Sequence, residues 1–239
     1  MKIIEKLKQA LYPEHYTCAL CDKEINYTGS DFCDECLPKL PIINSKVCLR
    51  CGEPINIHSN YCLTCKNTHH HFKKNISCFT YEPPISNLII KYKFNNAKYL
   101  GNIFSSFMLQ KCIEANIIPD IIIPVPLHSA RIKERGFNQA ELLCKDFANK
   151  INKPILSNCL VRIKNTPKQS TLSPSDRLNN VKDAFKVVDN SQIKNKIILL
   201  VDDVYTTGAT LSACAQALLK AKAKEVYCLT IAHAIKNKI

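Results

Sequence analysis

One stretch of the chain, Lys196–Leu211, most constrains what this sequence can fold into; it reads KIILLVDDVYTTGATL. The continuous apolar run Ile197–Val201 is typical of a strand buried on both faces of a parallel sheet. Two adjacent carboxylates, Asp202 and Asp203, end the run, and a polar turn leads into a helical pattern from Leu211. A strand that enters a helix through a polar loop places that loop at the carboxyl edge of a sheet, where open α/β folds bind ligands.

The turn after the two acids has the chemistry of an anion site. It contains three hydroxyls and a glycine, in the order TTGAT. Together with the free amides at the start of the following helix, these groups suit a phosphate. Asp202 and Asp203 cannot contact a phosphate, but they can accept hydrogen bonds from sugar hydroxyls, directly or through a hydrated Mg²⁺. A solvated strand end is the plainer alternative, and it leaves the threonines and the glycine unexplained.

This stretch resembles the binding signature of type I phosphoribosyltransferases. The resemblance implies that the two acids hold the ribose hydroxyls of phosphoribosyl pyrophosphate (PRPP) as catalytic residues, with Mg²⁺ as cofactor. It further implies that the threonine-rich loop holds the 5′-phosphate. The implied PRPP-binding residues are Asp202, Asp203, Val204, Tyr205, Thr206, Thr207, Gly208, Ala209 and Thr210.

A length of 239 residues allows one well-packed domain and a small module. We expect residues 1–72 to form an N-terminal helix and a cysteine-rich module, and residues 73–239 to form the α/β domain. No stretch approaches about 18 uninterrupted apolar residues, and the N-terminus lacks the apolar region of a signal peptide. The sequence therefore predicts a cytoplasmic protein without stable membrane insertion. The amphipathic spacing of residues 1–11 would also suit a membrane surface, but packing on the protein itself is favoured.

The formal net charge of +13 favours polyanionic partners such as pyrophosphate or nucleic acid. Most of the positive excess lies in residues 76–239, which contain 23 Lys and Arg and 12 Asp and Glu. Residues 1–75 contain 10 Lys and Arg and 8 Asp and Glu. Biased base composition of the gene is an alternative explanation for the lysines. Arginine is more informative, because four of the five arginines fall between residues 131 and 177. Its planar, permanently charged fork suits phosphate recognition.

Eight of the fourteen cysteines form four Cys-x₂-Cys pairs in two similar units. In a reducing compartment such pairs favour metal binding over disulfides, and two pairs complete a four-sulfur zinc site. Two tandem zinc ribbons, each with one structural Zn²⁺, are the simplest interpretation, while a cross-braced pairing stays open. His69, His70 and His71 follow as an expected solvated linker, and the six remaining cysteines are expected in the core. The predicted ligands are Cys18, Cys21, Cys33, Cys36, Cys48, Cys51, Cys62 and Cys65.

The hydrophobic pattern in the rest of the chain predicts alternating strands and helices. Such an alternation is typical of a mostly parallel sheet flanked by helices. Residues 76–81 read as a strand, and a helix after Pro83 and Pro84 carries Ile85, Leu88, Ile89 and Tyr92 at helical spacing. A second helix is expected over residues 99–115. Further strands are expected over residues 120–125, which proline ends, and over residues 226–231.

Two polar segments complete the expected site. The segment PVPLHSARIKERGFNQAELL follows a strand end and leads into a helix, so its basic residues form a candidate pyrophosphate site: His128, Arg131, Lys133 and Arg135. Residues 163–172 read as a mobile loop able to close over a ligand, with an ordinary surface hairpin as the alternative. The polar residues assigned to this loop and its flanks are Arg162, Thr166, Gln169 and Arg177.

The cysteine-rich N-terminus, KYKF, PVPLHxxRxxxRGFNQAELL, RxxxTxxQxxLxxxxRxxNVxxAF and VDDVYTTGAT together resemble the ComF family of competence-associated phosphoribosyltransferase-like proteins. By this resemblance Lys93 and Leu127 join the pyrophosphate site. It implies a role in bacterial natural transformation, handling incoming single-stranded DNA in the cytoplasm, with a competence helicase as partner. A metabolic phosphoribosyltransferase that acts on a nitrogenous base is the alternative. A zinc-ribbon nucleic-acid adaptor with a vestigial transferase fold is a third hypothesis. The acceptor cannot be identified from the sequence, so enzymatic turnover is left open.

Overall fold

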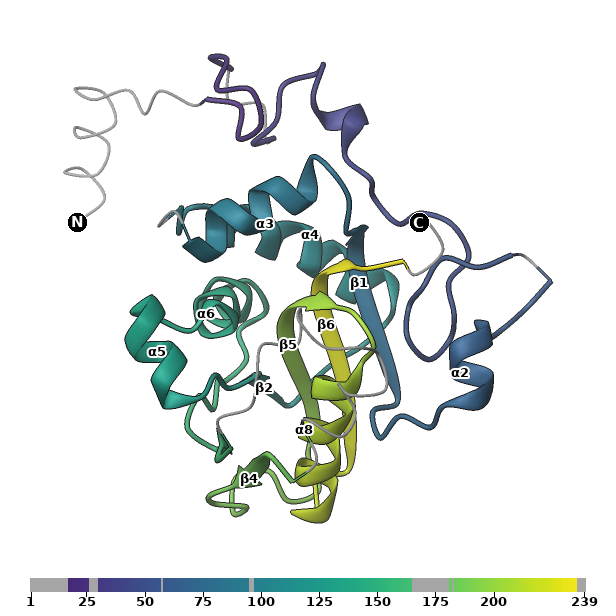
Figure 1. The fold of residues 1–239 in the computed structure, drawn as a ribbon, viewed down its shortest axis with the longest axis vertical. Helices are drawn as coiled ribbons and strands as arrows, with labels where there is room; N and C mark the ends of the chain where they lie inside the picture. Colours follow the sequence, from purple (N-terminus) through teal and green to yellow (C-terminus); the bar gives the residue numbers. More distant parts are fainter. Residues whose placement is uncertain are drawn as a thin grey trace. The chain divides into compact units, whose positions relative to one another are not determined.

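In the computed structural model, four parallel strands form the central sheet (Figure 1). Their spatial order is β1 (Lys74–Thr80), β6 (Glu225–His233), β5 (Ile197–Tyr205) and β2 (Ile121–Pro124). The register pairs Ile121 with Ile198 and Ile197 with Glu225. This arrangement confirms the predicted parallel sheet, with the predicted ligand-binding strand β5 as an inner strand.

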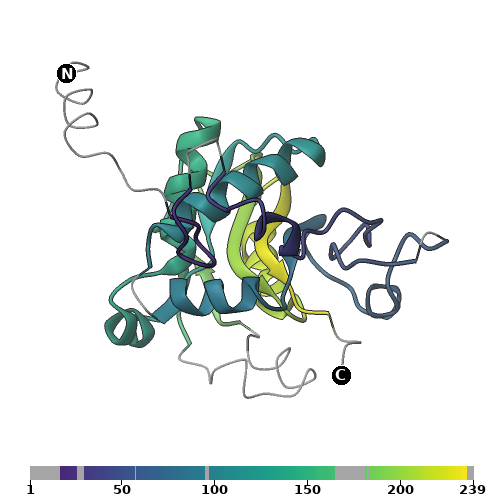
Figure 2. The same cartoon turned by 90° about the horizontal axis from the view of Figure 1, so that it is seen from above.

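Helices cover both faces of the sheet, which explains the continuous apolar runs of the inner strands. On one face, Ile198 and Leu200 of β5 share a buried cluster with Leu211 and Leu218 of helix α8 (Ala209–Lys220). Helices α4 (Leu100–Glu114) and α6 (Gln139–Ile151) pack against each other and against the strands of the sheet (Figure 2).

Short-range signals account for the helix boundaries. Helix α3 (Ile85–Phe94) follows Pro84 and buries all four residues predicted for its apolar face. Helix α6 begins at the N-cap Asn138, whose side chain accepts a hydrogen bond from the amide of Ala140, and it ends at Asn152 in the left-handed conformation.

Two elements differ from the sequence-based expectations. Strand β5 continues past its apolar run to Tyr205, because Asp202 and Tyr205 stay in register with Thr230 and His233 of β6. In the basic segment after β2, a helix that the sequence analysis did not predict, α5 (Ser129–Arg135), precedes the expected one, and Gly136 closes it at φ 82°. The other short helices are η1 (Leu37–Lys39) and α2 (Leu63–Asn67).

A separate antiparallel pair, β3 (Leu160–Arg162) and β4 (Phe185–Val187), lies outside the parallel sheet. The structure describes residues 17–25, 30–56, 58–94, 97–164, 181 and 183–235, apart from the side chains of Glu134 and Arg135. Most of the predicted mobile loop and the predicted helix of residues 1–11 therefore lie outside the described residues. Within those residues, every helix is too short or too polar to cross a membrane.

The chain divides into two compact units, Met1–Leu40 and Pro41–Ile239. The first cysteine quartet belongs to the first unit, and the second quartet belongs to the unit that contains the sheet. The division into residues 1–72 and 73–239, made from the sequence, stays a prediction. The six single cysteines are all buried, as expected for small core residues: Cys78, Cys112, Cys144, Cys159, Cys214 and Cys228.

Candidate functional site

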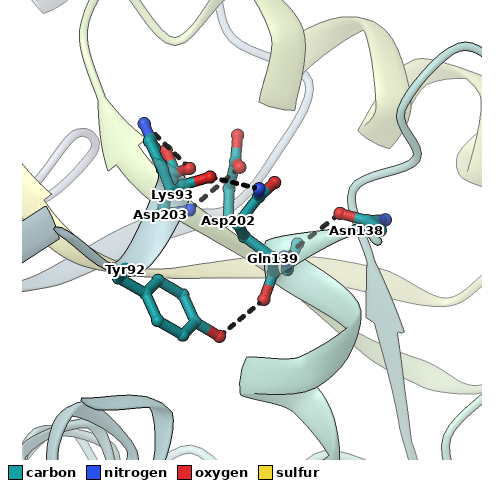
Figure 3. A network of polar contacts seen from close by, with 7 residues as sticks. Tyr92, Lys93, Asn138, Gln139, Asp202 and Asp203 are labelled. Carbon is teal, nitrogen blue, oxygen red and sulfur yellow. Dashed lines mark hydrogen bonds and ion pairs between the residues drawn. The ribbon is translucent and has the colours of Figure 1, made fainter. Parts of the chain in front are cut away.

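The two acids at the end of β5 are half-buried and close to a lysine (Figure 3). The Nζ atom of Lys93, in the last turn of α3, lies 2.9 Å from Oδ2 of Asp203. The amide of Asp203 donates a 2.9 Å hydrogen bond to Oδ1 of Asp202. The fold thus brings Lys93 to the acid pair, although more than one hundred residues separate them in the sequence.

The electrostatics of this pair favour a bound cation. Burial, followed by the negative charge of Asp203, raises the pKa of Asp202 to about 7. The charges of Lys93 and Arg162 act in the opposite direction and lower the pKa of Asp202. Two neighbouring carboxylates that water solvates poorly gain from a divalent cation, so the pair fits hydrated Mg²⁺.

A hydrogen-bonded network fixes the position of Lys93. Tyr92, buried next to it, donates a 3.0 Å hydrogen bond to the carbonyl of Gln139. The side-chain amide of Gln139 donates to the carbonyl of Lys93 at 3.3 Å (Figure 3). Asn138 donates to the carbonyl of Val125 at the end of β2. These contacts tie α3, α6 and β2 together beside the acids.

Sequence reasoning did not assign Asn138 and Gln139 to the site. The available signal was their place in the FNQAELL segment, where two polar amides enter an amphipathic helix. Gln139 is 2% exposed, so it lies inside the protein, where a polar side chain needs hydrogen-bond partners.

The loop between β5 and α8 has the geometry of a helix N-terminus built around glycine. Gly208 is the N-cap of α8 at φ 74°, and its carbonyl accepts from the amide of Ser212. The hydroxyl of Thr207 accepts from the amide of Ala209 at 3.4 Å. A Cβ on Gly208 would lie 2.7 Å from Cζ of Tyr205, so the tyrosine ring packs directly against this glycine. Glycine is therefore required by both conformation and space.

Apart from Lys93 in α3, the predicted pyrophosphate residues lie between β2 and α6. The His128 side chain caps α5 by accepting a hydrogen bond from the amide of Ala130 at 3.2 Å. Leu127 and Arg131 are half-buried, and Lys133 is exposed. Arg135 ends helix α5. His128 therefore has a structural role in the described geometry, as a helix cap.

Arg162 links the antiparallel pair to this site. Its guanidinium lies 5.5 Å from the ring centre of Phe185. Burial, followed by the charge of Arg131, lowers the pKa of Arg162, while the charge of Asp202 raises it. These mutual effects place Arg162, Arg131 and Asp202 in one electrostatic neighbourhood. The other residues assigned to the loop and its flanks, Thr166, Gln169 and Arg177, lie outside the described residues.

The eight paired cysteines form two four-sulfur clusters, and in each the four Sγ atoms lie within 4.8 Å of one another. Neighbouring pairs combine in sequence, so the geometry excludes the cross-braced alternative. The Sγ atoms of Cys21 and Cys33 are 3.8 Å apart, and those of Cys51 and Cys62 are 3.6 Å apart. Tetrahedral Zn²⁺ with Zn–S bonds of about 2.3 Å requires sulfur separations of about 3.8 Å. Both clusters are zinc-binding sites.

The two clusters repeat the same backbone turn. The amide of Cys18 donates to the carbonyl of Lys23, and that of Cys48 donates to the carbonyl of Glu53, both at 2.8 Å. The residue after the first Cys-x₂-Cys pair of each cluster is left-handed: Asp22 at φ 58° and Gly52 at φ 78°. This confirms the predicted internal repeat and the tight turn at Gly52.

The second zinc ribbon packs directly on the loop between β5 and α8, and this contact was not predicted from the sequence. Cys48, Cys51 and Cys62 share a buried cluster with Tyr205 and Ala209. A small cavity at this junction is lined by Cys51, Glu53, Thr64 and Cys65 of the ribbon and by Tyr205, Thr206, Thr207, His233 and Ala234.

The expectation of a solvated histidine linker was wrong for His70. Its side chain is 2% exposed and stacks on Phe72, with ring centroids 4.9 Å apart. Phe72 in turn belongs to the cluster that joins the ribbon to α8. The linker between the ribbon and β1 is therefore part of the core at this point.

Comparisons with known proteins agree with this architecture. The double zinc ribbon domain family matches residues 7–66, and the phosphoribosyl transferase domain family matches residues 107–238. Competence protein F of Haemophilus influenzae is 29% identical over 226 residues, covering 92% of this chain and 98% of that protein. DNA utilization protein YhgH of Salmonella typhi is 31% identical over 219 residues, covering 89% and 95%. Competence protein ComFC of Bacillus subtilis is 29% identical over 235 residues, covering 90% and 93%.

These matches extend over both zinc ribbons and the parallel sheet, and they confirm the fold class and the resemblance expected from the sequence. The chain belongs to the ComF family of competence and DNA utilization proteins, with a double zinc ribbon ahead of a phosphoribosyltransferase domain.

Proposed function

We propose that this protein binds PRPP with Mg²⁺ and acts in natural transformation, handling incoming single-stranded DNA in the cytoplasm. One observation carries the PRPP part. The half-buried acid pair Asp202 and Asp203 is followed, within one short loop, by a glycine-capped helix N-terminus. A sugar bearing a phosphate needs both kinds of group at this spacing. The names of the relatives, competence and DNA utilization proteins, support the cellular role.

Each part of PRPP has a matching set of residues. The carboxylates of Asp202 and Asp203 accept hydrogen bonds from the ribose hydroxyls, directly or through water on Mg²⁺. The Thr206–Thr210 loop binds the 5′-phosphate through its hydroxyls and through the first amides of α8. The pyrophosphate is expected toward the residues predicted for it, which are Leu127 and the basic residues Lys93, His128, Arg131, Lys133 and Arg135.

Lys93 has two partners in this scheme. Its Nζ atom lies 2.9 Å from Oδ2 of Asp203 and neutralises that carboxylate. A divalent cation at the acids takes over that neutralisation, which leaves the lysine free to turn toward the negatively charged pyrophosphate. Arg162 flanks the same site just before the predicted loop of residues 163–172, whose closure would bring Thr166 and Gln169, with Arg177 at its flank, to the bound ligand.

Isothermal titration calorimetry with PRPP and Mg²⁺ tests the binding site. We expect saturable binding by the wild type and none by Asp202→Asn/Asp203→Asn. Asp183→Asn provides the matched control, because it removes one exposed carboxylate at a left-handed position that asparagine tolerates. Equal affinity of the wild type and the double variant would contradict the proposal.

A second assay separates a transferase from a PRPP-binding protein without turnover. Release of pyrophosphate is measured with PRPP, Mg²⁺ and a panel of purine and pyrimidine bases. Release with one base identifies a metabolic phosphoribosyltransferase, in which Lys93 and Arg131 would stabilise the departing charge. PRPP binding without release for any base assigns PRPP the role of a regulatory ligand.

A further inference from the structure

The connection between α3 and α4 carries the most exposed aromatic side chains in the described part of the chain. Phe94, the last residue of α3, is 60% exposed, and Tyr99, just before α4, is 59% exposed. Tyr61 and Tyr81, the other exposed aromatics in the described ranges, reach 40% and 36%. Large aromatic surface in contact with water at one place indicates a binding surface.

The same segment has an unusual charge. Residues 83–113 contain four lysines and no aspartate or glutamate. Two of these lysines, Lys91 and Lys98, are exposed beside the two aromatics. The Nζ atom of Lys98 also lies 5.1 Å from the ring centre of Phe137, which brings a third, half-buried aromatic to this surface. We call this surface the α3–α4 ridge: Lys91, Phe94, Lys98, Tyr99 and Phe137.

The ridge adjoins the acid pair through one residue. Lys93, next to Phe94 in the sequence, contacts Asp203 at 2.9 Å. The backbone of this residue is held by Gln139, which directly follows Asn138 and Phe137. The ridge and the proposed PRPP site therefore share two segments of the chain: the end of α3 and the residues at the start of α6.

We propose that the α3–α4 ridge binds single-stranded nucleic acid, with bases stacked on Phe94 and Tyr99 and phosphates on Lys91 and Lys98. Exposed aromatics next to cations, without acidic residues in the segment, are what a flexible polyanion with π faces requires. Double-stranded DNA keeps its bases stacked and offers nothing to the aromatics. An acidic protein segment would use the lysines and has no comparable need of the rings. This inference rests on the proposed role in DNA handling and assigns it to one face.

Fluorescence anisotropy with labelled oligothymidylate tests the stacking part. Because this variant removes two stacking surfaces, Phe94→Ala/Tyr99→Ala is expected to weaken binding by roughly tenfold or more at every salt concentration. The melting temperature and PRPP affinity of this variant are expected to match those of the wild type. Should the double alanine variant unfold, Phe94→Leu keeps apolar volume without an aromatic face and is expected to weaken binding in the same direction.

The lysines make a different prediction. Each phosphate contact contributes about −0.7 to the slope of log K against log salt for single strands. Lys91→Ala/Lys98→Ala is therefore expected to reduce the magnitude of this slope by about 1.4, whereas the aromatic variant leaves the slope unchanged. Lys194→Ala/Lys196→Ala is the matched control, because it removes two exposed lysines just before β5, at the opposite end of that strand from the acids.

The outcomes separate this inference from the proposed function. Wild-type affinity in the aromatic variant overturns the ridge as the DNA site, and loss of binding in Tyr61→Ala instead assigns the site to the second ribbon. A wild-type protein that does not bind oligothymidylate overturns both the ridge and the DNA-handling role. PRPP binding is measured on the same samples, and its result is independent of the DNA-binding result.

Discussion

The ring of Tyr205 stacks on the ring of His233, with centroids 4.5 Å apart and planes inclined by 21°. The two residues are register partners at the ends of β5 and β6, and the amide of Ala234 donates to the Tyr205 carbonyl at 2.8 Å. Phe72, from the chain that leaves the second ribbon, meets Tyr205 edge to face at 6.3 Å. Tyr205, at the base of the loop between β5 and α8, is thus held both by β6 and by the segment that follows the second ribbon.

This support makes Gly208→Ala a sensitive test of the loop. The new Cβ would fall 2.7 Å from Cζ of Tyr205, at a position with φ 74°. We expect a loss of stability of about 1–3 kcal/mol and at least a tenfold loss of PRPP affinity. Thermal melting and calorimetry measure the two effects.

Gly136→Ala is the control for backbone conformation alone. Gly136 has φ 82°, but nothing lies within 4 Å of the position its Cβ would take. It should cost about 1 kcal/mol of stability, the ordinary penalty of a left-handed alanine. Equal destabilisation by the two variants would show that the contact with Tyr205 does not constrain the loop.

Zinc in the second ribbon is expected to support PRPP binding. Cys65 is a member of the second cluster and also lines the cavity shared with Thr206 and Thr207. Because metal supplies much of the folding free energy of so small a module, Cys65→Ser should release zinc and loosen the adjoining loop. We predict a tenfold or greater loss of PRPP affinity, with zinc content followed by atomic absorption.

Cys159→Ser is the matched control for this experiment. Cys159 is a buried single cysteine whose thiol donates to the carbonyl of Asp189, a bond that serine can also make. This variant should keep two zinc ions and wild-type PRPP affinity. If Cys65→Ser lost its zinc and still bound PRPP normally, the ribbon would have no supporting role at the loop.

Local patterns were enough to predict much of the fold, because they depend on neighbouring residues. The apolar run Ile197–Val201 and the buried face of α3 followed from strand and helix periodicity, and the cysteine spacing predicted both zinc clusters. The packing of the second ribbon on Tyr205 could not be predicted, since it joins residues far apart in the chain. The burial of His70 and the contact between Gln139 and Lys93 have the same long-range origin.

Lys93→Met is expected to weaken PRPP binding about tenfold. The lysine and Asp203 side chains are only 20% and 16% exposed, so water screens their attraction poorly. Removing the ammonium group leaves two carboxylates without this partner and takes one cation from the pyrophosphate side. Calorimetry at constant Mg²⁺ measures the change. Lys91→Met removes an exposed charge from the same helix and should bind PRPP as the wild type does; identical affinities for both variants would count against the role of Lys93.

The burial of His70 predicts a pH dependence of stability. Burial, followed by the charge of Arg50, lowers the pKa of His70 from 6.5 to about 4. Between these values the unfolded histidine binds a proton that the folded one does not, so unfolding takes up a proton. The contribution to the free energy of unfolding is therefore complete above pH 6.5 and is lost as the pH falls toward 4.

Urea denaturation at pH 7.5 and pH 5.0, with saturating zinc, measures this contribution. By linkage, about 2 kcal/mol of this contribution is lost between pH 7.5 and pH 5.0. His70→Phe cannot titrate and can stack on Phe72, so between the two pH values the wild type should lose about 2 kcal/mol more stability than this variant. His58→Asn replaces an exposed histidine and should follow the wild type. Parallel losses in the wild type and His70→Phe would mean that protonation at other groups, such as the zinc thiolates, governs acid unfolding.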